Sequence, residues 1–403
     1  MESTETVTVL VLVKTGSKYE QKNINGISHF LEHLFFKGTK KRPTAFEIAQ
    51  TLDSIGGAYN AFTGKEYTGF WAKVTGQHLD LALDWLSDLL LNPRFREADI
   101  GREKGVIVEE IKMQRDVPMG YVADLWEMLL YKDQPAGWLI IGKEENISRV
   151  KRKDILDYFK SQYSAENTIV CVAGKIGPGV AKKIGQCFEE IEKAELNQKE
   201  KVVEVQKDPD ALLYFKKTDQ THFCLGARGF DLLSPQRYIQ MVLAVILGGN
   251  ASSRLFISIR QKAGLAYYIH TSSGTYTDTG YLVTQAGVAH KNVKKAVGLI
   301  LKEYRTMKEK RVTKEELQKA KDYLKGTMSL NLETSDAQAS FYATQELLRR
   351  EIITPHQLFE KIDKVTLNDI QEIAKAIFQP QKLNLALIGP FKEKKDFRKL
   401  LKI

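Results

Sequence analysis

Two histidines and one glutamate lie within five consecutive residues near the start of the chain, as His29-Phe-Leu-Glu32-His33. If this segment is helical, the two histidines project from one face, one turn apart. Imidazoles at that spacing can share one zinc ion at about 2.0–2.1 Å. Glu32 lies on the same side and is expected to deprotonate a zinc-bound water, whose pKa zinc lowers to about 7. Three fixed residues also occur together by chance, so this segment alone does not establish a metal site.

A catalytic zinc usually has three protein ligands and one open position. The segment 97–114 has helical spacing and carries Glu103, Glu109 and Glu110 among apolar residues. Glu103 and Glu110 are seven residues apart and share a face, whereas Glu109 points about 100° away. Burying unpaired carboxylates is costly, so a cation is expected beside them. We interpret Glu110 as the third ligand and Glu103 as a group that orients a histidine ligand; an exposed acidic helix is the alternative.

These candidate residues belong to a chain that alternates predicted strands and helices. The expected elements are a strand at 7–14, helices at 26–37, 43–55 and 97–114, a hairpin around Gly64 and a strand at 168–174. Residues 195–210 are highly charged, have no helical apolar stripe and are expected to form a linker.

The second half repeats the pattern of the first. THFCLGARGF, beginning at Thr221, corresponds to VTVLVLVKTG, beginning at Val7, with an offset of 221 − 7 = 214. A tandem duplication predicts an α+β protein of two homologous α/β-sandwich domains, 1–194 and 211–403, with mixed or antiparallel sheets and helices on one face. A shift of 217 puts other residue types at the positions of His29, Glu32, His33 and Glu110, namely Ile246, Gly249, Asn250 and Thr327. Only the first domain is therefore expected to hold metal.

The chain resembles the pitrilysin-like zinc metallopeptidases, which are inverzincins because H-x-x-E-H inverts the commoner H-E-x-x-H order. That family includes insulin-degrading enzyme, mitochondrial processing peptidase and short bacterial processing-peptidase-like proteins. Its distal glutamate ligand follows the second histidine by 77 positions, as Glu110 follows His33 (110 − 33 = 77), and Glu103 matches its glutamate seven residues earlier. The segments NGISHFLEHLFFKGT, GGAYNAFTGKEYTGF and EKGVIVEEIKM also match, and the resemblance covers almost the whole chain.

The resemblance implies one zinc ion per chain, held by His29, His33 and Glu110. Arg260 and Tyr267, seven residues apart in the second domain, match a family pair that hydrogen-bonds the scissile carbonyl and stabilises its oxyanion. By itself Arg260 is more typical of a surface helix. Three further residues match the edge strand that pairs with an extended peptide: Asn60, Ala61 and Phe62.

The function expected from these features is a zinc-dependent endopeptidase that hydrolyses peptides, unfolded segments or presequences in a closed chamber. Two alternatives are open: a non-catalytic structural or partner subunit of a processing-peptidase-like complex, and a peptide-binding chaperone that retains a metal site. Chains of this short form usually pair, so a homodimer or a heterodimer with a related subunit is expected.

Composition excludes several other classes of protein. The net charge of +10 over 403 residues is spread along the chain without interleaved aromatics, so nucleic-acid binding is not expected. There is no apolar stretch of the roughly 18 residues that a membrane span needs. Three cysteines, Cys171, Cys187 and Cys224, lack metal-ligand spacing and favour a reducing compartment. The bacterial cytoplasm is expected; an organelle stays open, because relatives usually have an earlier strand that is missing before Val7.

Overall fold

The computed structural model describes residues 1, 4–195 and 198–403. The chain forms two compact units, and each unit is assembled from three separate stretches of sequence. The first unit comprises Met1–Met113, Trp138–Glu200 and Leu330–Ile353; the second comprises Gln114–Gly137, Lys201–Ser329 and Thr354–Ile403. Residues 196–197 of the predicted linker lie outside the described residues.

The first unit is built on one antiparallel sheet with the strand order β2-β3-β1-β4. Its strands are β1 (Thr6–Val13), β2 (Ala58–Thr63), β3 (Thr68–Thr75) and β4 (Thr168–Gly174). Its helices are α1 (Ile27–Phe35), α2 (Ala45–Asp53), α3 (Leu79–Leu91), α4 (Glu97–Asp116, whose last turn enters the second unit), α6 (Glu144–Arg149), α7 (Arg152–Gln162), α8 (Val180–Phe188) and α12 (Ser335–Arg349). Single-turn helices are η1 (Ser17–Tyr19), η2 (Lys22–Ile24), η3 (Gly76–His78) and η5 (Ala165–Asn167).

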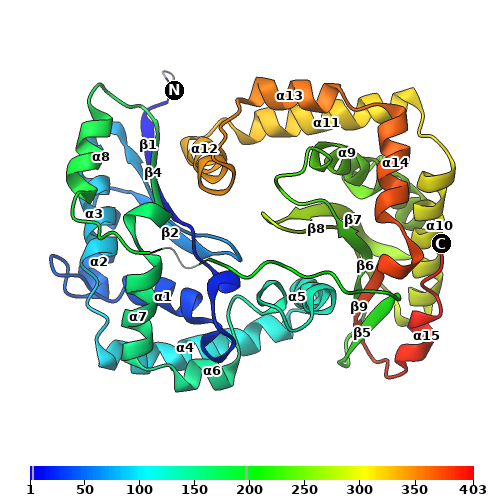
Figure 1. Cartoon of the computed structure of the whole chain (residues 1–403), viewed down its shortest axis with the longest axis horizontal. Helices are drawn as coiled ribbons and strands as arrows, with labels where there is room; N and C mark the ends of the chain where they lie inside the picture. The colour runs from blue at the N-terminus through cyan, green and yellow to red at the C-terminus, as the bar shows by residue number, and fades with distance from the viewer. Residues whose placement is uncertain (2–3, 196–197) are drawn as a thin grey trace. The chain divides into compact units, whose positions relative to one another are not determined.

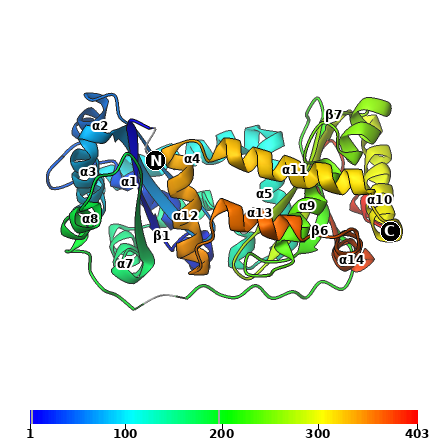
Figure 2. The same ribbon diagram turned by 90° about the horizontal axis from the view of Figure 1, so that it is seen from above.

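Both faces of this sheet are covered by helices. Successive side chains of a strand point to opposite faces, so the buried valines of β1 (Val7, Val9, Val11 and Val13) meet the core that includes α1 and α3. Leu10 and Leu12 face the other way and pack against Ala339 and Ala343 of α12. Figure 1 shows α12 beside β1 and β4, and Figure 2 shows it beside β1. A helix from late in the sequence therefore completes the core of the first unit.

The second unit contains a mixed sheet with the order β5-β9-β6-β8-β7, in which only the β5–β9 pair is parallel. The strands are β5 (Asp210–Phe215), β6 (Thr221–Gly229), β7 (Ala266–Thr275), β8 (Gly280–Val288) and β9 (Leu383–Gly389). The helices are α5 (Pro118–Tyr131), α9 (Arg237–Gly248), α10 (Val293–Glu309), α11 (Lys314–Asn331), α13 (Pro355–Asp363), α14 (Leu367–Ile377) and α15 (Lys394–Arg398). Shorter elements are η4 (Pro135–Gly137), the π-helical turn η6 (Phe256–Lys262), η7 (His290–Asn292) and η8 (Pro380–Lys382).

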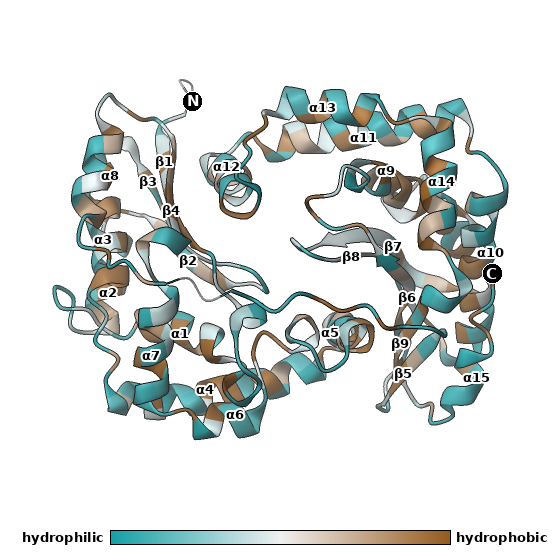
Figure 3. Cartoon of the chain, viewed as in Figure 1, coloured by the Kyte–Doolittle hydropathy of each residue, from teal (hydrophilic) through white to brown (hydrophobic). Residues whose placement is uncertain are grey.

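Helix α5 covers one face of this second sheet. Its residues Val122, Trp126 and Leu129 form a buried cluster with Cys224 of β6 and Ala386 of β9. Helices α9 and α14 also contact the sheet, and the alternation of hydrophobic and hydrophilic residues on α10 and α14 is visible in Figure 3. Helix α5 follows α4 in the first repeat, and α12 follows α11 in the same way in the second repeat. Helix α5 belongs to the unit with the second sheet and α12 to the unit with the first sheet, so the two repeats exchange one helix.

The predicted fold class is confirmed. Omitting β5, the second sheet has the order β9-β6-β8-β7, which repeats the order β4-β1-β3-β2 of the first sheet and agrees with an internal duplication. The predicted boundaries 1–194 and 211–403 assigned α5 to the first domain and α12 to the second, whereas the structure assigns each helix to the other unit. Helices on a single face also describe the first sheet incompletely. None of the helices in the described part of the chain is both long enough and apolar enough to cross a membrane.

Candidate metal centre

Helix α1 carries the H-x-x-E-H residues, and its start is held firmly. Gly26 has φ 102°, which favours glycine, and an added Cβ would lie 2.7 Å from the carbonyl oxygen of Ile141. The Glu20 carboxylate accepts hydrogen bonds of 2.8 Å from the backbone N–H groups of Gly26 and Ser28, which lack partners within the helix. The apolar stripe of α1 is buried in the core of the first unit, so the opposite stripe presents His29, Glu32 and His33.

The structure brings His29, His33 and Glu110 together. One ligand atom from each residue lies within 4.8 Å of the others. Glu110 Oε2 is 3.5 Å from His33 Nε2 and 3.7 Å from His29 Nε2. A tetrahedral zinc with bonds of about 2.0–2.1 Å separates its ligand atoms by about 3.3 Å. Two imidazoles and one carboxylate at these separations therefore fit zinc with only small side-chain adjustments.

Burial shifts the pKa values of His29 and Glu32, the first a candidate ligand and the second the candidate base. Burial, followed by the neighbouring His33, lowers the pKa of His29 to about 3, so its imidazole is neutral and keeps the lone pair that a metal ligand needs. Burial also raises the pKa of Glu32, while the Thr63 hydroxyl and His33 oppose that rise. A carboxylate with a raised pKa is a better proton acceptor near neutral pH, which suits a general base.

Glu103 supports His33 from the side away from Glu110. Its Oε2 lies 3.2 Å from His33 Nδ1, and its Oε1 lies 2.9 Å from the Lys37 ammonium. When Nδ1–H donates to this buried carboxylate, Nε2 is left to face Glu110 as a metal ligand. Sequence reasoning missed Lys37; its position four residues after His33 was the available signal.

Substitution Glu103→Gln is expected to weaken zinc binding about 10–100-fold, because the amide is a poorer acceptor for His33 and does not neutralise Lys37. A competitive titration with a chromophoric zinc chelator measures the change. The matched control is Glu109→Gln on the same helix, where the side chain is 73% exposed and paired with Lys112. Equal zinc affinities for the two variants would show that Glu103 does not support the site.

The predicted peptide-binding residues lie on β2, an edge strand of the first sheet. Asn60 and Phe62 are exposed, whereas Ala61 is buried. Arg260 and Tyr267 belong to the second unit. The Arg260 guanidinium lies 4.8 Å from the centre of the Phe256 ring within η6. Tyr267 is 74% exposed and lies at the irregularity in the β7–β8 pairing.

Thr63, the last residue of β2, is a further member of the site that the sequence did not reveal. Its hydroxyl donates a hydrogen bond of 2.5 Å to Glu32 Oε2. Thr63 follows the three residues predicted to bind peptide, but a threonine in a strand has many structural roles. No sequence signal connected it with Glu32, because the two residues are 31 positions apart.

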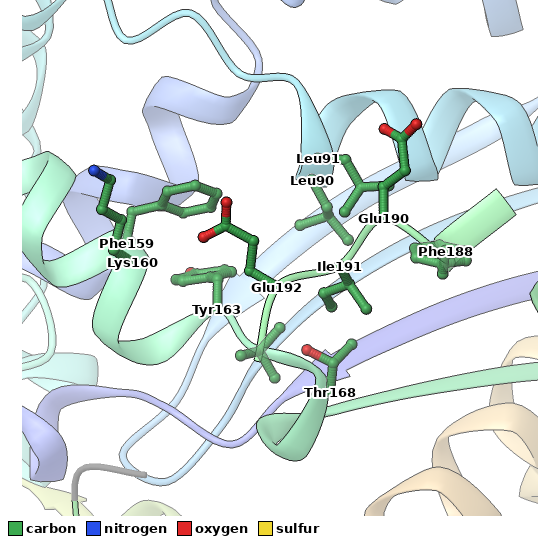
Figure 4. A pocket seen from close by; sticks show the side chains of 11 residues that line it. Leu90, Leu91, Phe159, Lys160, Tyr163, Thr168, Phe188, Glu190, Ile191 and Glu192 are labelled. Atoms are coloured by element: carbon green, nitrogen blue, oxygen red, sulfur yellow. The ribbon is translucent and has the colours of Figure 1, made fainter. Parts of the chain in front are cut away.

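A cavity of about 150 Å³ lies elsewhere in the first unit. Leu90, Phe159, Tyr163 and Ile191 are among the residues that line it (Figure 4). His29, His33 and Glu110 are not among its lining residues. The candidate centre is therefore identified by its ligand chemistry and by the carboxylates around it, and not by a cavity.

Comparisons with known proteins identify the family to which both halves of the chain are similar. Residues 1–143 match the family described as "Insulinase (Peptidase family M16)", and residues 149–324 match "Peptidase M16 inactive domain". The division agrees with the sequence repeat, in which the second half has no histidine or glutamate at the positions equivalent to the metal trio.

Curated relatives and solved structures extend the similarity over nearly the whole chain. The "Uncharacterized zinc protease YmxG" of Bacillus subtilis is 35% identical over 387 residues, which cover 95% of this chain and 93% of the relative. An "Uncharacterized zinc protease" of Rickettsia felis is 33% identical over 97% of this chain and 94% of its own length.

Two solved structures share the fold. A protease from Helicobacter pylori has a TM-score of 0.90 at 23% identity and covers 96% of this chain and 95% of its own. A chain of "Complex III2 from Candida albicans" has a TM-score of 0.85 at 18% identity and covers 100% of this chain and 96% of its own. The combined sequence and fold similarity establishes that the chain belongs to peptidase family M16, as a short member related to bacterial zinc proteases.

Proposed function

We propose that this protein is a zinc-dependent endopeptidase that hydrolyses peptides, unfolded segments or presequences. The observation that carries the proposal is the meeting of His29, His33 and Glu110, with the Glu32 carboxylate on the same stripe of α1. The relatives from Bacillus subtilis and Rickettsia felis are named zinc proteases, which supports zinc as the metal and peptide hydrolysis as the reaction.

His29, His33 and Glu110 would hold the zinc ion, which when bound supplies Lewis-acid activation of the scissile carbonyl and of water. Glu32 removes the proton from the attacking water and then delivers it to the leaving nitrogen. Glu103 keeps the His33 ring in the orientation that the ligand set needs. Among the described residues of this stripe, His29 and His33 are assigned as ligands, which leaves the Glu32 carboxylate as the proton acceptor.

An extended peptide would bind by adding a strand to the free edge of β2 beside Asn60, Ala61 and Phe62. The family resemblance supports the proposal that Arg260 and Tyr267 hydrogen-bond the scissile carbonyl, and that a second domain closes a chamber around the peptide. We also propose a homodimer or a heterodimer with a related subunit, which light scattering during size-exclusion chromatography would measure. The three free cysteines support a reducing compartment such as the bacterial cytoplasm.

Zinc analysis combined with a cleavage assay tests the proposed function. The purified chain is expected to contain about one zinc ion and to cleave quenched fluorescent peptides. A chelator is expected to abolish cleavage, and added zinc to restore it, because the proposed reaction needs a metal held by the three ligands. Zinc-free protein whose peptide cleavage is absent with and without added zinc would favour the non-catalytic partner subunit. The complete ligand set argues against that alternative.

A further inference from the structure

We infer that Thr63 is a positioning residue for the general base: its hydroxyl fixes the Glu32 carboxylate and links that base to the strand that presents the peptide. The inference rests on the proposed function. Its observations are the 2.5 Å hydrogen bond from Thr63 Oγ1 to Glu32 Oε2 and the place of Thr63 at the end of β2.

The face of β2 that carries Thr63 is the face directed toward α1. Side chains alternate along a strand, and Tyr59, Ala61 and Thr63 are less exposed than Ala58, Asn60 and Phe62. Tyr59 stacks on Phe36 immediately after α1, and β2 contacts α1 directly. The Thr63 hydroxyl therefore reaches Glu32 from a β-branched side chain that is well suited to a strand.

The hairpin loop after Thr63 is fixed to its surroundings. Thr63 pairs with Thr68 across β2 and β3, and the Gly64 N–H donates to the Tyr67 carbonyl oxygen at 2.8 Å. The backbone N–H of Lys18 donates to the Lys65 carbonyl oxygen at 2.9 Å. The buried ammonium of Lys18 also lies 2.9 Å from the carboxylate of Glu66. A loop held on both sides keeps Thr63 in place, so its hydroxyl can serve as a fixed reference point.

The bond leaves the two oxygens of Glu32 in different environments. Within the described part of the chain, Thr63 is the only residue that hydrogen-bonds to the Glu32 side chain, and it bonds to Oε2. Oε1 is therefore the oxygen available to a water molecule. Without the hydroxyl, the carboxylate can rotate, and a displacement of about 1 Å can reduce a catalysed rate on the order of 100-fold.

The same strand offers its unpaired edge to a peptide and holds the base. Because Asn60 to Phe62 directly precede Thr63, a peptide paired with β2 has a fixed register relative to Glu32. The hydrogen bond thus ties the position of the attacked peptide bond to the position of the group that activates water. Loss of the bond is expected to impair turnover while leaving main-chain pairing with the peptide intact.

The test compares Thr63→Val, which keeps the shape but removes the hydroxyl, with Thr63→Ser, which keeps it. Thr63→Val is expected to lower kcat about 10–100-fold, with KM within about twofold and zinc content unchanged. Thr63→Ser is expected to retain most of the wild-type kcat. Thr75→Val, the same change at the exposed end of β3, is the matched control. In a Glu32→Gln background, Thr63→Val is expected to cause no further loss, because the base that it positions is already absent.

Crystal structures of the wild type and the Thr63→Val variant provide a readout that does not depend on activity. The Glu32 carboxylate is expected to leave its position or become disordered in the variant. An unmoved and ordered Glu32, or a kcat equal to that of Thr75→Val, would overturn the inference. Failure of the proposed function would be recognised separately, because the wild type would then show no zinc-dependent cleavage; the crystallographic comparison would still decide the role of Thr63.

Discussion

Replacement of Glu32 with glutamine is expected to leave the zinc content near one per chain and to reduce peptide cleavage by a factor of at least about 10²–10⁴. Glutamine has nearly the same shape, and its carbonyl oxygen can still accept the hydrogen bond from Thr63. It cannot accept the proton from water, so the chemical step loses its base. Single-turnover cleavage of a quenched peptide, measured together with metal content, checks both parts of the expectation.

The control for this substitution is Glu109→Gln, which makes the same change at an exposed carboxylate of α4. It is expected to cleave peptides at the wild-type rate. If Glu32→Gln turned over peptides as fast as this control, Glu32 would have no role as the base. If it instead lost its zinc, the residue would have to be interpreted as part of the metal-holding set.

Removal of the Glu110 carboxylate by substitution with alanine is expected to abolish both zinc retention and cleavage. Glu110 supplies the third ligand, and its Oε2 lies within 3.7 Å of one nitrogen of each histidine. Two imidazoles alone leave half of a tetrahedral site without protein ligands. The loss of zinc affinity should therefore exceed the roughly 10–100-fold change that follows removal of a supporting group such as Glu103.

Glu109→Ala tests the direction of the α4 side chains. The Glu109 side chain directly precedes Glu110 in the sequence, is 73% exposed and forms an ion pair with Lys112. This variant is expected to bind zinc with wild-type affinity in a dialysis or chelator-competition experiment. Full zinc occupancy in Glu110→Ala, or a loss of zinc in Glu109→Ala, would contradict the proposed ligand set.

Helical spacing indicated which polar residues of α1 and α4 share a face, and the family resemblance indicated that these two faces meet. A separation of four puts His29 and His33 on one stripe, and a separation of seven puts Glu103 and Glu110 on another, so the two helices needed only to face each other. Lys37 was missed although its spacing from His33 was a usable signal, whereas Glu20 and Thr63 were not predicted for a different reason. Their partners depend on where loops and the end of a strand lie in three dimensions, which the periodicity of a sequence does not encode.

The fold shows the same limit of sequence reasoning. Alternating and 3.6-residue patterns identified the strands and helices, and the offset between the halves identified the duplication. The amphipathic pattern of α5 and α12 shows that each helix must bury one face. It does not show which sheet receives that face, because Leu10 and Cys224 are equally suitable apolar partners. The exchange of the two helices therefore became apparent only from the structure.

This exchange has a consequence for the protein as it leaves the ribosome. The last strand of the first sheet ends at Gly174, but α12, which covers Leu10 and Leu12, begins only at Ser335. The intervening 334 − 174 = 160 residues take about 8–32 s to translate at roughly 5–20 residues per second. For that period the nascent chain has no α12 to cover the apolar sheet face formed by Leu10 and Leu12, so this face stays open to non-native apolar contacts until synthesis is nearly complete.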